Sequence, residues 1–232
     1  MIGFNQLGNA GRLGNQMFQY ASLMGIAKNR NFDWAIPPKE VFGTTDHKVR
    51  ESNVNVYDAF KLSSAKNQKI IDGPYEHERT PYFDRKLFDH CPDNVSVDGY
   101  LQDEKYFKHI KKDILREFDF LEHTKEVAHT IMKKYVDAKK VSIHIRRTDY
   151  LSAGCRSVPT LDYYTHGMSL FKNSRFFIFS DDLEWCKAQS IFRTSEKKIV
   201  FSGTNNAYVD LCLMSLCDHN ILANSSYSWW AS

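Results

Sequence analysis

The second half of the chain alternates between short apolar runs typical of buried strands and longer segments with helical periodicity. The predicted strands span residues 141–145, 175–180, 197–202 and 219–223, and the predicted helices between them span 161–171, 182–189 and 207–217. Strands that alternate with helices in this way form a parallel sheet covered by helices. The alternation therefore predicts an α/β fold for this half of the chain.

The first half begins with a unit of the same kind. Residues 2–7 form a predicted strand, and residues 8–16 (GNAGRLGNQ) form a glycine-rich turn. A helix is predicted from Asn15 onward, because apolar residues recur there at helical spacing. A second strand at residues 34–38 (WAIPP) ends at two prolines. This order is again one unit of a parallel α/β layout.

The region that follows is less regular. Residues 40–94 are rich in Asn, Asp, Lys and Pro, which predicts loops with short helices. A buried strand is predicted at residues 95–101 (VSVDGYL). Amphipathic helices are predicted at 104–118, with Leu115 facing inward, and at 122–135.

The composition suits two compact domains and excludes several classes of protein. Of the 232 residues, 42% are hydrophobic, which is enough for a core in each of two domains. We expect two α/β domains, residues 1–120 and 121–232, with a cleft between them. A formal net charge of +3 gives no case for a nucleic-acid-binding protein. No stretch approaches the roughly 18 apolar residues of a membrane helix, and the N-terminus lacks the pattern of a secretion signal.

The five cysteines are scattered and form no CxxC pair. Free thiols in a reducing compartment are therefore favoured over a zinc site. Together with the absence of a secretion signal, this predicts a cytoplasmic protein without a membrane span.

Three polar clusters follow strands of the second domain, at the edge where parallel sheets bind ligands. Arg146 and Arg147 follow the strand at 141–145, Asp181 and Asp182 follow the strand at 175–180, and Asn224, Ser225, Ser226 and Ser228 follow the strand at 219–223. One polar turn is ordinary, but three at one edge predict a binding site.

The residue types in these clusters suit a diphosphate ligand. Arginine offers planar, permanently charged donors that bind phosphate oxygens in pairs. Ser225 and Ser226 stand where a helix can begin, so their hydroxyls and free backbone N–H groups suit a further phosphate oxygen, although Ser225 is equally a candidate cap. Asp181 or Asp182 is suited to accept a hydrogen bond from a sugar or base hydroxyl.

Several of these residues also have a structural interpretation. Arg146 and Arg147 can pair with Asp149 and with another acid. Asp182 precedes a predicted helix and can be its N-cap. His144 lies inside a strand and is more typical of a satisfied core histidine than of a catalytic base.

Five segments, in this order and at this spacing, resemble the α-1,2-fucosyltransferase family. They are GRLGNQMFQYA (11–21), GYLQDEKYF (99–107), HIRRTDY (144–150), FSDD (179–182) and ANSSYSWW (223–230). Each segment alone is a weak signal, whereas five in order are specific and span almost the whole chain. The first and third segments are also similar to those of the more distant protein O-fucosyltransferases.

The resemblance implies a GT-B-like fold, an inverting transfer and GDP-L-fucose as the donor substrate. The first domain would be the acceptor side and the second would bind GDP-fucose. The acceptor would be a glycan, with the 2-OH of a galactoside as the position implied by the family. No metal cofactor is expected, because the chain has no Asp-x-Asp pair with which a divalent ion is commonly held, and arginine would neutralise the diphosphate instead.

The resemblance also assigns roles to individual residues. Arg146 would neutralise the β-phosphate of the departing GDP, with His144, Arg147 and Asp149 in support. Asn224, Ser225, Ser226 and Ser228 would line the diphosphate and fucose, together with Asp181 and Asp182. Asn15 would lie in an N-terminal loop near the bond that breaks and would take part in catalysis with Arg146 and Asp149, and Gly14 would contribute to binding of the donor.

Some alternatives stay open from the sequence alone. Asn15 either caps the helix that follows it or contributes its amide to the reaction. The general base is either Asp149 or an acid between residues 72 and 104. Family members continue past the S-W-W motif, so the resemblance implies a sequence truncated at its C-terminal end. A degenerate transferase that only binds a nucleotide or glycan, and a transferase for another nucleotide sugar, are the rival functions.

Overall fold

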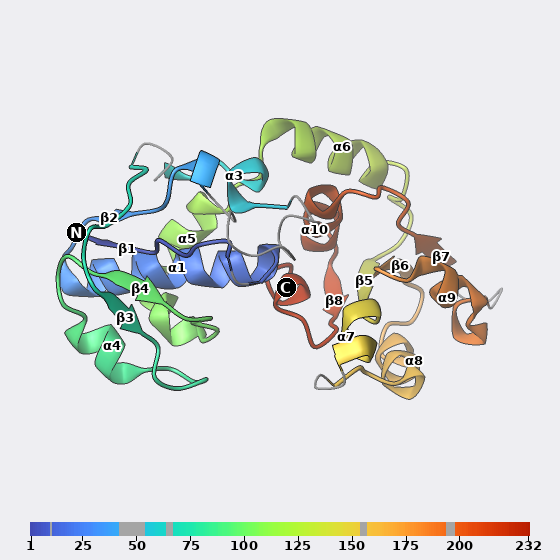
Figure 1. Cartoon of the computed structure of the whole chain (residues 1–232). Helices are drawn as coiled ribbons and strands as arrows, with labels where there is room; N and C mark the ends of the chain where they lie inside the picture. Colours follow the sequence, from blue (N-terminus) through green and yellow to red (C-terminus); the bar gives the residue numbers. More distant parts are fainter. Residues whose placement is uncertain (10, 42–53, 64–66, 154–156, 194–197) are drawn as a thin grey trace. The chain divides into compact units, whose positions relative to one another are not determined.

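The computed structural model describes residues 1–9, 11–41, 54–63, 67–153, 157–193 and 198–232. Over these residues the chain divides into two compact units, Met1–Leu121 and Glu122–Ser232. In the described chain each unit contains a four-stranded parallel sheet, whose strands and covering helices are labelled in Figure 1. Cys155 lies outside the described residues.

The first unit is built on a sheet with the strand order β2-β1-β4-β3. Its strands are β1 (Ile2–Gly3), β2 (Trp34–Ala35), β3 (Tyr75–His77) and β4 (Ser96–Asp98). Its helices are α1 (Leu13–Arg30), α3 (Val56–Ala59), α4 (Arg85–His90) and α5 (Lys111–Glu117), with 3-10 turns η1 (Lys39–Val41), η3 (Glu104–Tyr106) and η4 (Lys108–Ile110). The long helix α1 is buried over most of its length, its polar residues Gln16 and Gln19 included.

Helix α1 begins two residues earlier than predicted. It starts at Leu13, and its N-cap Arg12 makes no side-chain capping bond. Asn15 therefore lies in the first turn rather than at the cap position. The interpretation of Asn15 as the cap of this helix is wrong.

The single helix predicted at residues 104–118 is also wrong. The segment consists of η3, η4 and α5, and Phe107 separates the two 3-10 turns with non-helical backbone angles (φ −131°, ψ 0°). Tyr106 and Phe107 are buried, and a Cβ at Gly25 of α1 would lie 1.9 Å from the Tyr106 carbonyl oxygen. This close packing on α1 overrides the local helical pattern, and Leu115, predicted to face inward, is 65% exposed.

The second unit has the strand order β7-β6-β5-β8. Its strands are β5 (Lys140–Ile145), β6 (Arg175–Ser180), β7 (Lys198–Phe201) and β8 (His219–Ile221). Its helices are α6 (Glu122–Met132), α7 (Thr148–Ala153), α8 (Leu161–Ser169), α9 (Leu183–Ala188), α10 (Ala207–Ser215) and α11 (Ser226–Trp229), with the 3-10 turn η5 (Ser190–Phe192). Each strand overlaps the run from which it was predicted.

The two faces of the second sheet carry different residues because side chains alternate along a strand. Val141, Ile143 and Ile145 of β5 face a core that includes residues of α8 and α9. Ser142 and His144 point to the opposite face, where the Ser142 hydroxyl donates to the Asn220 side chain. His144 therefore lies on the same face of the sheet as Ser142, near the carboxyl end of β5.

None of the helices in the described parts of the chain combines the length and the apolar character needed to cross a membrane.

Candidate functional site

The strand order of the second unit creates a switch point beside β5. The chain passes from β5 to β6 and β7 on one side, and then returns through α10 to β8 on the other side of β5. In open parallel sheets, ligands bind outside the carboxyl ends of the strands at such a point. The segment that follows β5 begins with Arg146, and the segment that follows β8 contains Asn224.

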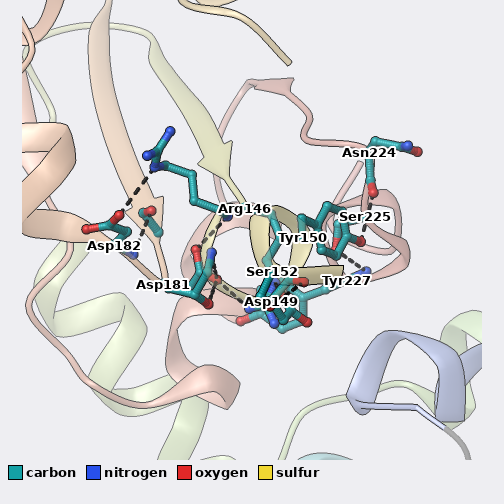
Figure 2. A network of polar contacts seen from close by, with 12 residues as sticks. Arg146, Asp149, Tyr150, Ser152, Asp181, Asp182, Asn224, Ser225 and Tyr227 are labelled. Atoms are coloured by element: carbon teal, nitrogen blue, oxygen red, sulfur yellow. Dashed lines mark hydrogen bonds and ion pairs between the residues drawn. The ribbon is translucent and has the colours of Figure 1, made fainter. Parts of the chain in front are cut away.

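Arg146 is held by two carboxylates at this edge (Figure 2). Its Nε lies 2.9 Å from Asp149 Oδ1, and its Nη1 lies 3.3 Å from Asp181 Oδ2. The side chain is only 15% exposed, and its guanidinium carbon is 5.8 Å from the centre of the Tyr150 ring. The orientation of the guanidinium is therefore fixed from several sides.

Asp181 holds the turn between β5 and α7. Its carboxylate accepts hydrogen bonds from the backbone N–H of Arg147 (2.9 Å) and of Thr148 (3.1 Å), and from the Thr148 hydroxyl. Because it also pairs with Arg146, Asp181 positions the arginine and the turn together. These contacts are structural, whereas the sequence left two roles open for Asp181, a hydrogen bond to a sugar or base hydroxyl and a structural one, and favoured the structural one.

Arg147 has different surroundings from its neighbour. Its guanidinium carbon lies 3.5 Å from the centre of the Trp185 ring, and its Nε donates to Asp182 Oδ2 at 3.3 Å. Asp182 is also the N-cap of α9, since its Oδ1 accepts from the backbone N–H of Trp185. Arg147 and Asp182 thus hold the start of α9 against the end of β5. This favours the structural interpretation, in which Arg147 pairs with an acid and Asp182 is an N-cap.

His144 is buried near the carboxyl end of β5, two residues before Arg146. Its side chain packs against the ring of Tyr227 at a centroid distance of 5.5 Å, and its Nδ1 has no hydrogen-bond partner among the described residues. Burial, and to a smaller extent the charge of Arg146, lowers the pKa of His144 from 6.5 to about 4. The imidazole is therefore neutral at pH 7. His144 is a buried histidine, as the sequence favoured, but its hydrogen bonds are not satisfied by the described residues, because Nδ1 has no partner among them.

The segment after β8 is joined to α7 by a tyrosine that the sequence analysis did not single out. The Tyr150 hydroxyl donates to the Asn224 carbonyl oxygen at 2.9 Å, which brings the end of β8 next to the Arg146 turn (Figure 2). Ser225 is the N-cap of α11 and accepts from the Tyr227 N–H. The buried Ser228 donates to the Ser225 carbonyl oxygen at 3.3 Å. A short helix does begin at Ser226, as the sequence predicted, and Ser225 is its cap.

The remaining predicted residues, Gly14 and Asn15, belong to the first unit. Gly14 is buried in the first turn of α1. Asn15 accepts a hydrogen bond from Gln102 Nε2 at 2.7 Å. The residues labelled in Figure 2 all belong to the second unit, Arg146, Asp149, Tyr150, Asp181, Asn224 and Ser225 among them.

No cluster of three or more His, Cys, Asp or Glu side chains suited to a metal ion occurs among the described residues.

Comparisons of sequence agree with the five motifs. The model of glycosyl transferase family 11 matches residues 1–232. An alpha-1,2-colitosyltransferase of Escherichia coli is 29% identical over 96% of this chain and 84% of its own length. A galactoside 2-alpha-L-fucosyltransferase of Bos taurus, SEC1, is 26% identical over 96% of this chain, which spans 62% of the length of that relative.

Comparisons of structure show the fold. POFUT1 in complex with GDP superposes with a TM-score of 0.63 at 13% identity, covering 99% of this chain and 92% of POFUT1. The fucosyltransferase NodZ from Bradyrhizobium gives a TM-score of 0.60 at 12% identity, covering 99% of this chain and 91% of NodZ. The predicted GT-B-like α/β architecture is confirmed.

Proposed function

Because the chain belongs to glycosyl transferase family 11, and is a glycosyltransferase of that family, we propose that it transfers L-fucose from GDP-L-fucose to a glycan. The accepting group would be a hydroxyl, and the 2-OH of a galactoside is the position expected. The reaction would invert the anomeric centre and require no metal ion. The name of the Bos taurus relative supports the acceptor, and a solved structure of POFUT1 in complex with GDP-fucose supports the donor.

The observation that carries this proposal is the placement of Arg146. It follows the central strand β5 at the switch point of the sheet, and its guanidinium is oriented by Asp149 and Asp181. When the bond between fucose and GDP breaks, negative charge develops on the β-phosphate. A cationic donor that is already oriented stabilises this charge without reorganising at the moment of reaction.

Asp149 is assigned an orienting role rather than that of the general base. Its Oδ1 lies 2.9 Å from Arg146 Nε, so its carboxylate faces the group that would bind the departing diphosphate. An inverting reaction needs a base on the other side of the sugar, next to the acceptor hydroxyl. A carboxylate paired with the leaving-group arginine is poorly suited to act there.

A second candidate is a different donor sugar. The Escherichia coli relative is named as a colitosyltransferase, so the same scaffold carries at least one other sugar specificity. The name of this relative therefore favours one alternative, transfer of colitose from its GDP derivative.

The test is release of GDP and formation of product with purified protein. We expect turnover with GDP-L-fucose and a galactoside acceptor, and linkage analysis should give an α-1,2 bond. Turnover with the colitose donor alone would establish the second candidate. Binding of GDP-fucose without turnover, over a broad panel of acceptors, would contradict the proposed activity and favour the degenerate transferase.

Two variants of Arg146 test the assignment of the site. Arg146→Ala should lose about 10²–10³-fold in kcat, which corresponds to about 3–4 kcal/mol of transition-state stabilisation. Arg146→Lys should recover little, because a single ammonium replaces a planar fork with several donors. Near-parental turnover of folded Arg146→Ala would overturn the assignment.

Arg175 supplies a matched control for these variants. It lies at the start of β6 rather than at the carboxyl end of a strand, is 18% exposed, and pairs with Asp137 at 2.9 Å. Arg175→Ala therefore removes a similarly buried, carboxylate-paired guanidinium. It should affect thermal stability and leave turnover per folded molecule unchanged.

A further inference from the structure

The amino edge of the second sheet, at the other end of the strands from the candidate site, collects basic residues that lie far apart in the sequence. Strands β5, β6 and β7 each begin with one, and the register places Lys140 opposite Arg175 and Arg175 opposite Lys198. The turns that lead into β5 and β6, residues 133–139 and 170–174, add more. We call this surface the basic edge, and its basic residues are Lys133, Lys134, Lys139, Lys140, Lys172, Arg175 and Lys198.

Few carboxylates balance the charge of the basic edge. Its described part contains two acidic residues, Asp137 and Asp218. Asp137 pairs with both Arg175 and Lys198 at 2.9 Å, and Asp218 accepts a hydrogen bond from the backbone N–H of Lys140 at 2.7 Å. Seven basic against two acidic residues leave an excess of five formal positive charges, which is more than the net charge of +3 of the whole chain.

This arrangement costs the folded protein free energy, because like charges directly opposite each other on neighbouring strands repel. Asp137 offsets part of the repulsion, at the starts of β6 and β7. The lysines of the two turns are exposed, and within the described chain none of them forms an ion pair with a carboxylate: Lys133, Lys134, Lys139 and Lys172. A negatively charged surface laid against the basic edge would relieve the repulsion that remains.

Two aliphatic side chains are exposed in the same turns. Val136, between Lys134 and Lys139, is 82% exposed, and Leu170, two residues before Lys172, is 66% exposed. Basic side chains beside exposed apolar ones are typical of a protein that lies on an anionic bilayer, where the charges attract the headgroups and the apolar side chains enter the interface. A nucleic acid offers phosphates but no apolar layer for aliphatic side chains, so these two residues favour a membrane.

We propose that the basic edge binds the surface of an anionic lipid membrane, with the turn lysines at the phosphate headgroups and with Val136 and Leu170 in the interfacial layer. Strand β5 is six residues long, so its two ends lie about 17–20 Å apart. The Arg146 network at the far end of this strand is thereby kept away from the lipid. The inference concerns binding alone and goes beyond the proposed function, because it holds whichever sugar is transferred.

Sedimentation with lipid vesicles tests the proposal directly. The purified protein should bind vesicles of mixed phosphatidylcholine and phosphatidylglycerol, and should not bind vesicles of phosphatidylcholine alone. Added NaCl should release it, because salt screens exposed charges. Each lysine near an anionic surface strengthens binding about fivefold. The triple variant Lys133→Gln, Lys134→Gln, Lys172→Gln should therefore bind the anionic vesicles about 10²-fold more weakly than the parent.

Three exposed lysines of the first unit supply a matched control. The variant Lys86→Gln, Lys111→Gln, Lys112→Gln removes the same charge from other surfaces and should bind anionic vesicles like the parent. Both triple variants change exposed side chains only, and their melting temperatures check that they are folded. An equal loss of binding in the two would mean that net charge alone decides, and would overturn the proposal. Failure of the parent to bind anionic vesicles at low salt would overturn it as well.

The double variant Val136→Ser, Leu170→Ser separates a membrane from other polyanions. It leaves the charge unchanged and should bind anionic vesicles at least tenfold more weakly, because the aliphatic contacts with the interface are lost. Unchanged vesicle binding would refute the proposal, and tight binding of the parent to a nucleic-acid duplex would then assign the basic edge to a nucleic acid. Neither assay needs a nucleotide sugar, so this inference and the proposed function fail or hold independently.

Discussion

The buried His144 makes the stability of the protein depend on pH in a window that can be stated in advance. Its pKa is lowered from 6.5 to about 4 in the folded protein, chiefly by burial. In the unfolded chain the imidazole is exposed and takes up a proton near pH 6.5. Stability is therefore fully present above pH 6.5, and is lost as the pH falls from 6.5 toward 4.

The size of the effect follows from the shift itself. A difference of about 2.5 pH units, at about 1.36 kcal/mol per unit, corresponds to about 3 kcal/mol of unfolding free energy between pH 7.5 and pH 4. That is a large part of the stability of an ordinary domain. No discount for solvent screening is needed, because the side chain is only 5% exposed.

Urea unfolding followed by tryptophan fluorescence measures this dependence, since Trp185, Trp229 and Trp230 all lie in the same unit as His144. The parent should lose stability steeply from pH 6.5 to pH 4.5. His144→Gln should show a much flatter profile over the same range, although its absolute stability will differ. His166→Gln, which removes an exposed histidine of α8, should follow the profile of the parent.

Parallel profiles for the parent and His144→Gln would refute this reasoning. They would mean that the imidazole has the same pKa in the folded and unfolded states. The His144 ring would then be hydrated in the folded protein. Subtracting the two profiles removes the contributions of the other titrating groups. Only the difference attributable to residue 144 remains, which makes the comparison decisive.

Two further predictions concern the site itself. Turnover should persist in excess EDTA, measured as GDP release, because Arg146 is proposed to stabilise the charge that develops on the departing diphosphate; a strict requirement for added Mg²⁺ or Mn²⁺ would overturn that proposal. Trp185→Leu should lower Tm by several degrees and leave kcat within about threefold of the parent, because it removes the ring beneath Arg147 rather than a group of the Arg146 network. A large loss of kcat without a change in Tm would instead assign Arg147 to the reaction.

The second unit could be predicted well from the sequence because its strands are continuous apolar runs. The strand Arg175–Ser180 has the predicted ends, and the alternation with helices indicated the parallel layout. The strand Tyr75–His77 was missed because it is a short strand at the edge of the sheet, with polar and exposed residues that carry no apolar pattern. The helix predicted at 104–118 failed because burial of Tyr106 and Phe107 against α1 decides the backbone there.

The candidate site was predictable at the level of residue type and position along the strands. Arg146, with Asp149 and Asp181, could be found because charged turns after strands are visible in the sequence. The partners that distinguish Arg146 from Arg147 could not, since the contact of Arg147 with Trp185 depends on how α9 packs. Tyr150 lies inside one of the family-like segments, and that segment was the one signal that pointed to it.

The local charges show why the structural and the ligand-binding interpretations of Arg146 are compatible. Its Nε and Nη1 face Asp149 and Asp181, so this cluster of three groups carries a formal charge of −1 rather than an excess of positive charge. Attraction of a diphosphate cannot come from net charge at this point. What the cluster supplies is a guanidinium whose orientation is already fixed by two carboxylates. Such a group contributes most where charge appears during the reaction, so its removal should lower kcat far more than it weakens binding of the nucleotide sugar.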